Sequence, residues 1–118
     1  MNSERNFTDY LEDILDSALK ISLFIAEMSF DEFTKDDKTV FAVVRGLEII
    51  GEATKNIPSD VREKYAIIPW REMAGMRDKL THNYFGVNLL VVWKTATQDI
   101  PALVPLVRQI LLDTEMSE

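Results

Sequence analysis

The chain has 118 residues, a length typical of one domain, and 47% of them are hydrophobic. Thirteen lysines and arginines against 20 acidic residues give a net charge of -7, which disfavours broad, non-specific contact with a phosphate backbone. The absence of cysteine excludes disulfides and thiolate metal sites, and no apolar run reaches the ~18 residues of a membrane span. We therefore expect one compact cytoplasmic domain over residues 1–118, without a membrane partner.

The first two predicted helices follow from the spacing of apolar residues. In the first segment such residues alternate at spacings of four and three, which is typical of the buried seam of a bundle helix. They are Phe7, Leu11, Ile14, Ala18, Ile21, Ile25 and Met28. The segment SFDEFTKDD then breaks the pattern and is predicted to be a loop. Asp37 or Thr39 can cap a second helix, which Asn56 and Pro58 end.

A short connecting helix is predicted at SDVREKY, before a third long helix. Pro69 suits the first turn of that helix, because its missing N–H would have no partner there in any case. Met73, Met76 and Leu80 supply the apolar stripe of the third helix. Gly86 and Asn88 are predicted to mark its end and the cap of the next helix.

The last segment, residues 89–111, again has helical periodicity, but Pro101 removes a backbone donor inside it. We expect a kink or break near Asp99 and fraying over residues 113–118. The sequence thus predicts an all-α fold, an up-and-down antiparallel bundle of four main helices plus a short connecting helix. Its last helix is kinked or broken near Pro101.

The stretch RDKLTHNYF, residues 77–85, contains the only histidine of the chain. At about 100° per residue, Arg77 and Tyr84 lie roughly 20° apart beside the apolar stripe, whereas His82 lies opposite it. Asp78 shares the face of His82 and would orient the imidazole and favour its cationic form. Taken singly, each residue also has an ordinary role. His82 could cap a helix end, Arg77 could be an ion-pair partner, and Tyr84 could be a core aromatic.

A family resemblance covers most of residues 5 to 112. From FAVVRGLEIIGEATKNIP through IPWREMAGMRDKLTHNYFGVNLLVVWKTATQDIPAL, the sequence resembles the HepT-like branch of the HEPN superfamily, which are small all-helical toxins of prokaryotic toxin-antitoxin pairs. The diagnostic element is an arginine, four residues, a histidine, any residue and a tyrosine, met by Arg77, His82 and Tyr84. It comes with Gly51-Glu52 and Trp70-Arg71-Glu72. Thr81 is more polar than the small apolar residue expected before the histidine.

The resemblance implies a metal-independent endoribonuclease of the prokaryotic cytoplasm, with RNA rather than DNA as substrate and no cofactor. Arg77 and His82 would be the catalytic pair, and Asp78 would occupy the polar position that follows the arginine. The implied partner is a minimal nucleotidyltransferase antitoxin. This enzyme would attach AMP to Tyr84 and thereby inhibit the toxin.

The side chains suit this chemistry, because cleavage through the ribose 2′-hydroxyl needs a base near neutral pKa and a cation for the phosphorane charge. His82 and Arg77 can fill these roles. One histidine cannot readily be both base and acid, so we expect a two-fold homodimer that brings two copies of the pair to one cleft. Arg45 and Arg71 are weaker candidates to line that cleft, because surface ion pairing is the more ordinary role of such residues.

Two alternatives stay open at this point. A dedicated metal site is the weaker one, because it would need mostly carboxylates, and Glu48 and Glu52 are more simply a solvated or ion-paired helix face. The stronger alternative is a non-catalytic binding subunit of a small nucleotidyltransferase, in which the motif serves docking. Loss of RNA cleavage in His82→Ala would separate the enzyme from the binding subunit.

Overall fold

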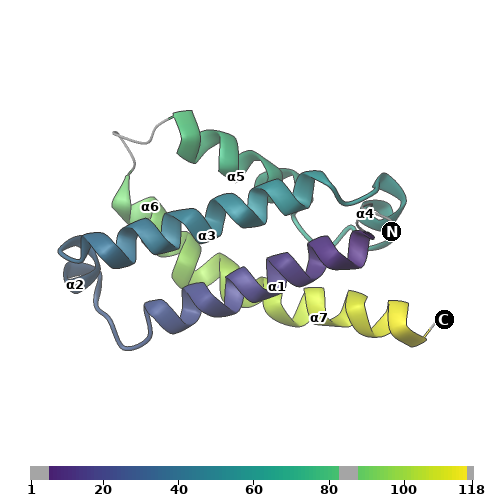
Figure 1. Ribbon diagram of the computed structural model, residues 1–118, viewed down its shortest axis with the longest axis horizontal. Helices are drawn as coiled ribbons and strands as arrows, with labels where there is room; N and C mark the ends of the chain where they lie inside the picture. The colour runs from purple at the N-terminus through teal and green to yellow at the C-terminus, as the bar shows by residue number, and fades with distance from the viewer. Residues whose placement is uncertain (1–5, 83–87, 117–118) are drawn as a thin grey trace, which may run out of the picture.

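Four long helices form the bundle in the computed structural model, which describes the backbone of residues 6–82 and 88–116 and their side chains except those of 77–82. They are α1 (Phe7–Phe24), α3 (Asp37–Lys55), α5 (Trp70–His82) and α7 (Ile100–Met116). Helix α3 packs between α1 and α5, and α1 also packs against α7 (Figure 1). The predicted all-α bundle is confirmed, and the described ranges contain no strand.

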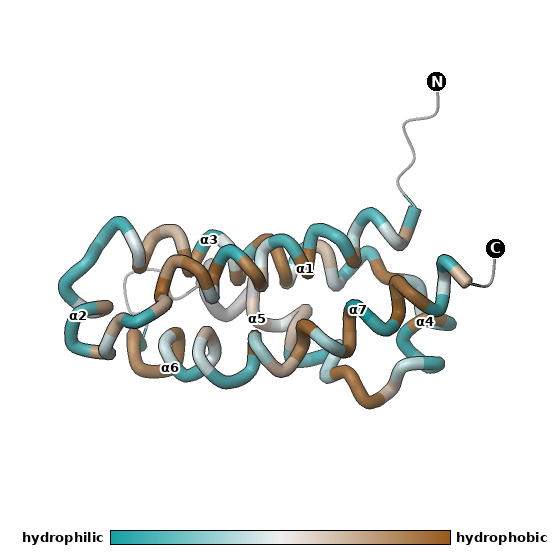
Figure 2. The backbone as a smooth tube through the Cα atoms, turned by 90° about the horizontal axis from the view of Figure 1, so that it is seen from below, coloured by the Kyte–Doolittle hydropathy of each residue, from teal (hydrophilic) through white to brown (hydrophobic). Residues whose placement is uncertain are grey.

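The core lies between these helices and is formed by buried apolar residues, among them Leu11, Ile14, Leu47 and Ile50; Figure 2 shows the hydropathy along the chain. Helix α1 begins at a capping box, in which Asn6 accepts from the backbone of Thr8 at 3.2 Å and Asp9 accepts from the backbone of Asn6 at 3.1 Å. Gly46 lets α1 and α3 approach closely, because a Cβ there would lie 2.8 Å from Cγ1 of Ile21. The four-three seam of the sequence therefore becomes the α1–α3 contact, although α1 ends at Phe24, before Ile25 and Met28.

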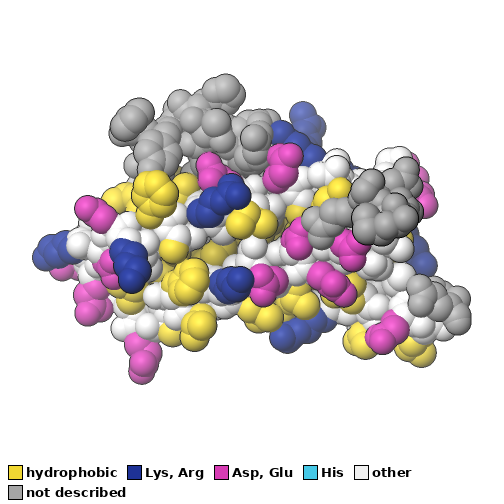
Figure 3. Space-filling model, in the orientation of Figure 1, with side chains coloured by type: hydrophobic (Ala, Val, Ile, Leu, Met, Phe, Trp, Pro, Cys, Tyr) yellow, Lys and Arg dark blue, Asp and Glu magenta, His cyan; other side chains and the backbone are white. Residues whose placement is uncertain are grey.

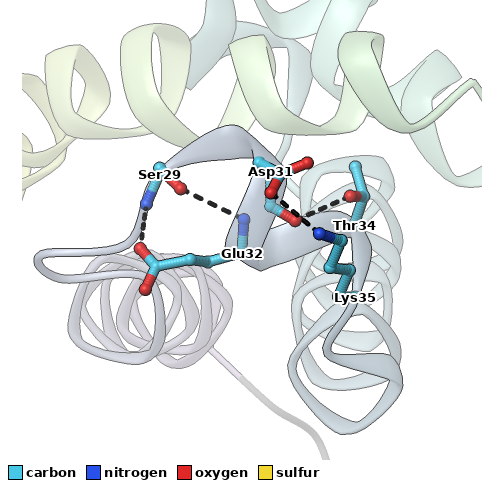
Figure 4. Close-up of polar contacts among 5 residues, drawn as sticks. All are labelled: Ser29, Asp31, Glu32, Thr34 and Lys35. Atoms are coloured by element: carbon cyan, nitrogen blue, oxygen red, sulfur yellow. Dashed lines mark hydrogen bonds and ion pairs between the residues drawn. The ribbon is translucent and has the colours of Figure 1, made fainter.

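A short helix, α2 (Phe30–Thr34), replaces the loop predicted at SFDEFTKDD, so that prediction was wrong. Ser29 accepts from the backbone of Glu32 at 3.1 Å, and Glu32 accepts from the backbone of Ser29 at 2.8 Å (Figure 4). These reciprocal bonds satisfy two donors that a helix start leaves unpaired. The turn is also held by packing, since the Phe33 ring is fully buried with its centroid 5.1 Å from that of Trp93.

Both ends of α3 are capped. Asp36, rather than the predicted Asp37 or Thr39, is the N-cap, and its carboxylate accepts from the backbone N–H of Thr39 at 3.1 Å and from its hydroxyl at 2.8 Å. At the other end, Arg62 of α4 (Ser59–Lys64) donates to the carbonyl of Thr54 at 2.6 Å. The predicted end at Asn56 and the short connecting helix at SDVREKY are both confirmed.

The last helical segment is interrupted where the proline predicted an interruption. Helix α6 (Leu89–Lys94), capped by the predicted Asn88, runs into a π-helical turn, η2 (Thr95–Asp99), which ends where α7 begins. The hydroxyls of Thr95 and Thr97 donate to carbonyls four residues earlier, both at 2.8 Å. The π-helical turn thus lies directly before the position at which Pro101 lacks a backbone donor. Helix α7 also contains Pro105 in its interior and continues to Met116.

Candidate functional site

Helix α5 carries the arginine and histidine of the motif, and its start is fixed by a short chain of hydrogen bonds. Pro69 lies just before the first turn, as predicted, and its carbonyl accepts from the N–H of Met73 at 3.1 Å. The Trp70 indole is buried and donates to the carbonyl of Tyr65 at 3.1 Å. From this anchor α5 runs back along α3 toward the end of the bundle that carries α2 and α6 (Figure 1).

Tyr65 joins this anchor to α7. Its hydroxyl donates to Oδ2 of Asp113 at 2.8 Å, and Gln109 donates to the other oxygen of the same carboxylate at 2.8 Å. The hydrogen bond from Tyr65 lowers the pKa of Asp113, and the same bond raises the pKa of Tyr65. The first turn of α5 is thus tied to a helix that it does not pack along.

We expect Tyr65→Phe to lower the thermal stability of the fold near neutral pH and to lose this effect in acid. Because the pKa of Asp113 is lowered from 3.8, its contribution to stability is present above 3.8 and is lost as the pH falls through the folded value. The raised pKa of Tyr65 sets the opposite limit, so its contribution is present below 10.0 and is lost at higher pH. Melting curves of both proteins at pH 7 and pH 3 measure this. A difference that persists unchanged at pH 3 would contradict it.

The burial of α5 separates an inner from an outer face. Trp70 and Met73 are buried at 6% and 2% exposure, whereas Arg71 and Gly75 are exposed. No described side chain or backbone atom lies within 4 Å of where a Cβ on Gly75 would be. The outer face of the first two turns is therefore open to solvent in the single chain.

The backbone register extends these faces to the motif. Position 77 follows Trp70 by seven residues and Met73 by four, so it falls on the inner side of α5. Positions 78 and 82 follow Gly75 by three and seven residues and fall on the outer side. This agrees with the faces expected from the sequence, although the side chains of Arg77, Asp78 and His82 lie outside the described part. Tyr84 lies outside the described residues altogether.

The comparison with known proteins decides the family. A family model described as Ribonuclease HepT-like matches residues 14–110. The chain belongs to the HepT-like ribonuclease family. A relative from Thermococcus cleftensis, named provisionally as a ribonuclease HepT, is 56% identical over 100 residues, which are 85% of this chain and 91% of the relative.

Further relatives of the same family span nearly the whole chain. One from Caldanaerobacter subterraneus is 49% identical over 86% of this chain and 91% of its own length. Another, from Methanocaldococcus jannaschii, is 47% identical over 95% of this chain and 93% of its own length. Both are named provisionally as RNases. No solved structure gives a significant match.

In this HepT-like chain, the face of α1 and α3 carries charges of both signs with apolar side chains between them (Figure 3). Arg45 lies 3.6 Å from Glu48, and Lys20 lies 3.0 Å from Asp16, so both cations have acidic neighbours. Arg45, Lys20 and Asp16 line a groove of about 450 Å³ between the two helices. The proximity of Arg45 to Glu48 supports a surface ion pair for Arg45 rather than a place in the predicted RNA-binding cleft. It also makes Glu48 part of a charged helix face.

A second groove opens between α5 and α7, which do not pack against each other along their lengths. It measures about 440 Å³ and is mainly apolar, with Ile67, Met73, Met76 and Leu106 among its lining residues. Ile67 is 79% exposed at its rim. The groove reaches α5 at Pro69, Glu72, Met73 and Met76, on a different side of the helix from the outer face.

Among its described residues, the HepT-like chain shows neither a metal-binding group nor a membrane-spanning helix. Across residues 6–76 and 88–116, where side chains are described, no three His, Cys, Asp or Glu side chains gather as a metal-binding group would require. Among the described helices, none combines the length and apolar character needed to cross a bilayer.

Proposed function

We propose that this HepT-like chain is the toxin of a toxin-antitoxin pair and acts as a metal-independent endoribonuclease. His82 is the general base, Arg77 stabilises the charge of the phosphorane, and Asp78 orients the imidazole. Membership of a ribonuclease family supports the class of activity. The assignment is supported within the chain by the register of α5, in which positions 78 and 82 follow the exposed Gly75 by three and seven residues.

The proposed reaction needs no group beyond these side chains and the RNA. His82 removes the proton from a ribose 2′-hydroxyl, whose oxygen attacks the adjacent phosphorus. The P–O5′ bond breaks, the leaving oxygen takes up a proton from the imidazolium of His82 in a second copy of the chain, and a 2′,3′-cyclic phosphate remains on the upstream fragment. The negative charge that develops on the phosphorane oxygens is stabilised by the guanidinium of Arg77, which can contact two of them simultaneously.

The active unit is proposed to be a homodimer with Asp78 and His82 near its two-fold axis. A chain with one histidine has no second imidazole to protonate the leaving oxygen. Isologous dimers are the commonest oligomers, and a two-fold pairing through the outer face of α5 would bring both motifs to the same side of the assembly.

The proposed partner is a minimal nucleotidyltransferase that attaches AMP to Tyr84. This position follows His82 by two residues in the sequence, so an attached nucleotide would carry its phosphate close to the motif. A phosphate held near Arg77 would occupy the place that the RNA phosphate needs. The modification would therefore inhibit cleavage by charge and bulk.

Cleavage of RNA in the presence of excess EDTA tests the central proposal. We expect the purified chain to cut RNA without added metal, at an undiminished rate with chelator, and to leave 2′,3′-cyclic phosphate ends. A matched oligonucleotide with one 2′-deoxyribose at the cut site should resist cleavage there, because it lacks the nucleophile. A requirement for magnesium, or cleavage of the deoxy substrate, would contradict the mechanism. Binding to the nucleotidyltransferase without any cleavage would favour the binding subunit.

A further inference from the structure

Phe41 carries an aromatic ring that the core does not use. The ring lies on α3 and is 65% exposed, whereas the aromatic side chains of Phe33 and Trp70 are buried. One exposed apolar side chain is ordinary on a protein surface, so exposure alone assigns no role to it. Its role depends on what lies beside it.

The ring lies on the half of α3 that the motif end of α5 approaches. Helix α5 starts beside the end of α3 and runs back along it (Figure 1). Position 82 follows Trp70 by 12 residues, and counting 12 residues back from Lys55, where α3 ends, reaches roughly residue 43, because both helices rise about 1.5 Å per residue. Phe41 is only about 3 Å further along the axis. The ring and the proposed general base are therefore at the same level of the bundle.

The ring also lies on the same side of the α3–α5 pair as position 78. On α3, Val44 is buried about 160° around the helix from Gly46, which faces α1, so Val44 faces α5. Phe41 is about 60° from Val44 and about 140° from Gly46, so it borders the α5 side of α3. On α5, position 78 is about 160° from Met76, which lines the groove with α7. Both therefore lie on the open side of the pair, away from α7.

Charges of both signs surround the ring. Asp37 and Lys38 precede Phe41 by about one helix turn. Arg45 follows it by about one turn but lies 3.6 Å from Glu48. A surface of mixed charge cannot hold a phosphate backbone by electrostatic attraction alone, which agrees with the net charge of -7. The contact that this surface does offer to RNA is the face of the ring, which suits an unpaired base.

We infer that Phe41 is a substrate-binding residue, whose ring stacks on a base of the RNA next to the bond that is cut. Stacking would hold the strand beside position 82 without a large basic surface, because every base has an aromatic face. A base paired inside a duplex cannot present that face to the ring, so the nucleotide at Phe41 is unpaired. The inference rests on the proposed function, which it deepens by assigning a binding residue beside the catalytic pair.

Affinity for an RNA strand that cannot be cut tests the stacking apart from catalysis. A short oligonucleotide with 2′-O-methyl groups throughout lacks the nucleophile, and fluorescence anisotropy measures its binding. Phe41→Ala should weaken this binding by about 5-fold to 150-fold, the loss typical of one stacked base, whereas Phe41→Trp should bind at least as tightly as the parent. Phe24→Ala is the matched control, since Phe24 is 43% exposed but lines the groove between α1 and α3. Its affinity should equal that of the parent.

Removal of single bases identifies the base that contacts the ring. One abasic position in the same oligonucleotide should weaken binding to the parent by a similar factor and have little effect on Phe41→Ala, because both changes remove the same contact. In cleavage assays, Phe41→Ala should raise KM far more than it lowers kcat. A hairpin in which the same sequence is fully paired should bind weakly to both proteins.

Unchanged affinity for RNA in a folded Phe41→Ala variant would overturn the stacking. If that variant instead loses binding to the nucleotidyltransferase, the surface is a protein contact, and if it converts a dimeric parent into monomers, the ring belongs to the subunit contact. Either result, with RNA affinity intact, refutes the stacking and leaves the proposed function standing. A parent protein that cleaves no RNA refutes the proposed function, whereas the affinities still decide whether Phe41 stacks on a base.

Discussion

His82→Ala should lower the rate of RNA cleavage by roughly 10² to 10⁴-fold, the range typical for loss of a general base. No other histidine exists in the chain to replace it. Position 82 lies on the outer face of α5, in register with the exposed Gly75, so the substitution should leave the core intact. Initial rates on a defined RNA, with circular dichroism spectra of both proteins, measure the two effects separately.

Arg77→Ala should lower the rate of RNA cleavage by a similar factor. It can also destabilise the fold, because position 77 is in register with the buried Trp70 and Met73. Its long stem can contribute packing as well as charge. Arg77→Lys keeps much of the stem and a positive charge but cannot make a bidentate contact, so it should fold normally and still cleave slowly. Arg108→Ala, an exposed arginine on α7, is the matched control and should retain full activity. Full activity in His82→Ala would refute the assigned base, whatever Arg77 does.

Tyr84→Phe should abolish the addition of AMP by the neighbouring nucleotidyltransferase and ATP, and with it the inhibition of cleavage. In the parent protein, intact-mass spectra should show added AMP units, and the modified fraction should be inactive. The physical reason is that a phosphodiester at position 84 brings negative charge to the cation that should bind the RNA phosphate. The unmodified variant should cleave RNA at a rate close to that of the parent.

Another tyrosine provides the control for this experiment, since the chain has three and Tyr65 anchors α5. Tyr10→Phe should remain a substrate of the nucleotidyltransferase and be inactivated by it. If Tyr84→Phe is modified and silenced as readily as the parent, Tyr84 has a structural role and the inhibition has another origin. Loss of RNA cleavage without any added AMP would point to inhibition through binding of the nucleotidyltransferase alone.

Local sequence signals predicted the long helices well because each has a continuous apolar seam. The sequence does carry a signal for α2, because Ser29 and Glu32 are three residues apart and form a capping box. The cap of α3 is Asp36 rather than Asp37 or Thr39, because all three residues can cap a helix and they lie within four positions of the sequence. The tie between Tyr65 and Asp113 had no signal, because 48 residues separate the two and only the folded chain brings them together.

For the candidate site, the faces of α5 could be predicted from the sequence pattern, whereas the chemistry could not. Helical geometry alone predicted which side of α5 carries positions 78 and 82, and the burial of Met73 and exposure of Arg71 agree with it. The chemistry of Arg77 and His82 came from the family resemblance, since a single arginine and histidine on a helix have many ordinary roles.

A small tilt of α5 at its anchor, Trp70, would produce a large displacement at the other end of the helix. The helix is fixed at its first turn through the bonds to Tyr65 and from Tyr65 to Asp113, whereas position 82 lies about 18 Å further along a rigid rod. A tilt of only about 10° at the anchor would move the far end by roughly 3 Å, more than a catalytic hydrogen bond tolerates. Substitutions at Tyr65, about three helix turns from position 82, can therefore change the orientation of the end of α5 that carries the proposed catalytic residues while the bundle stays folded.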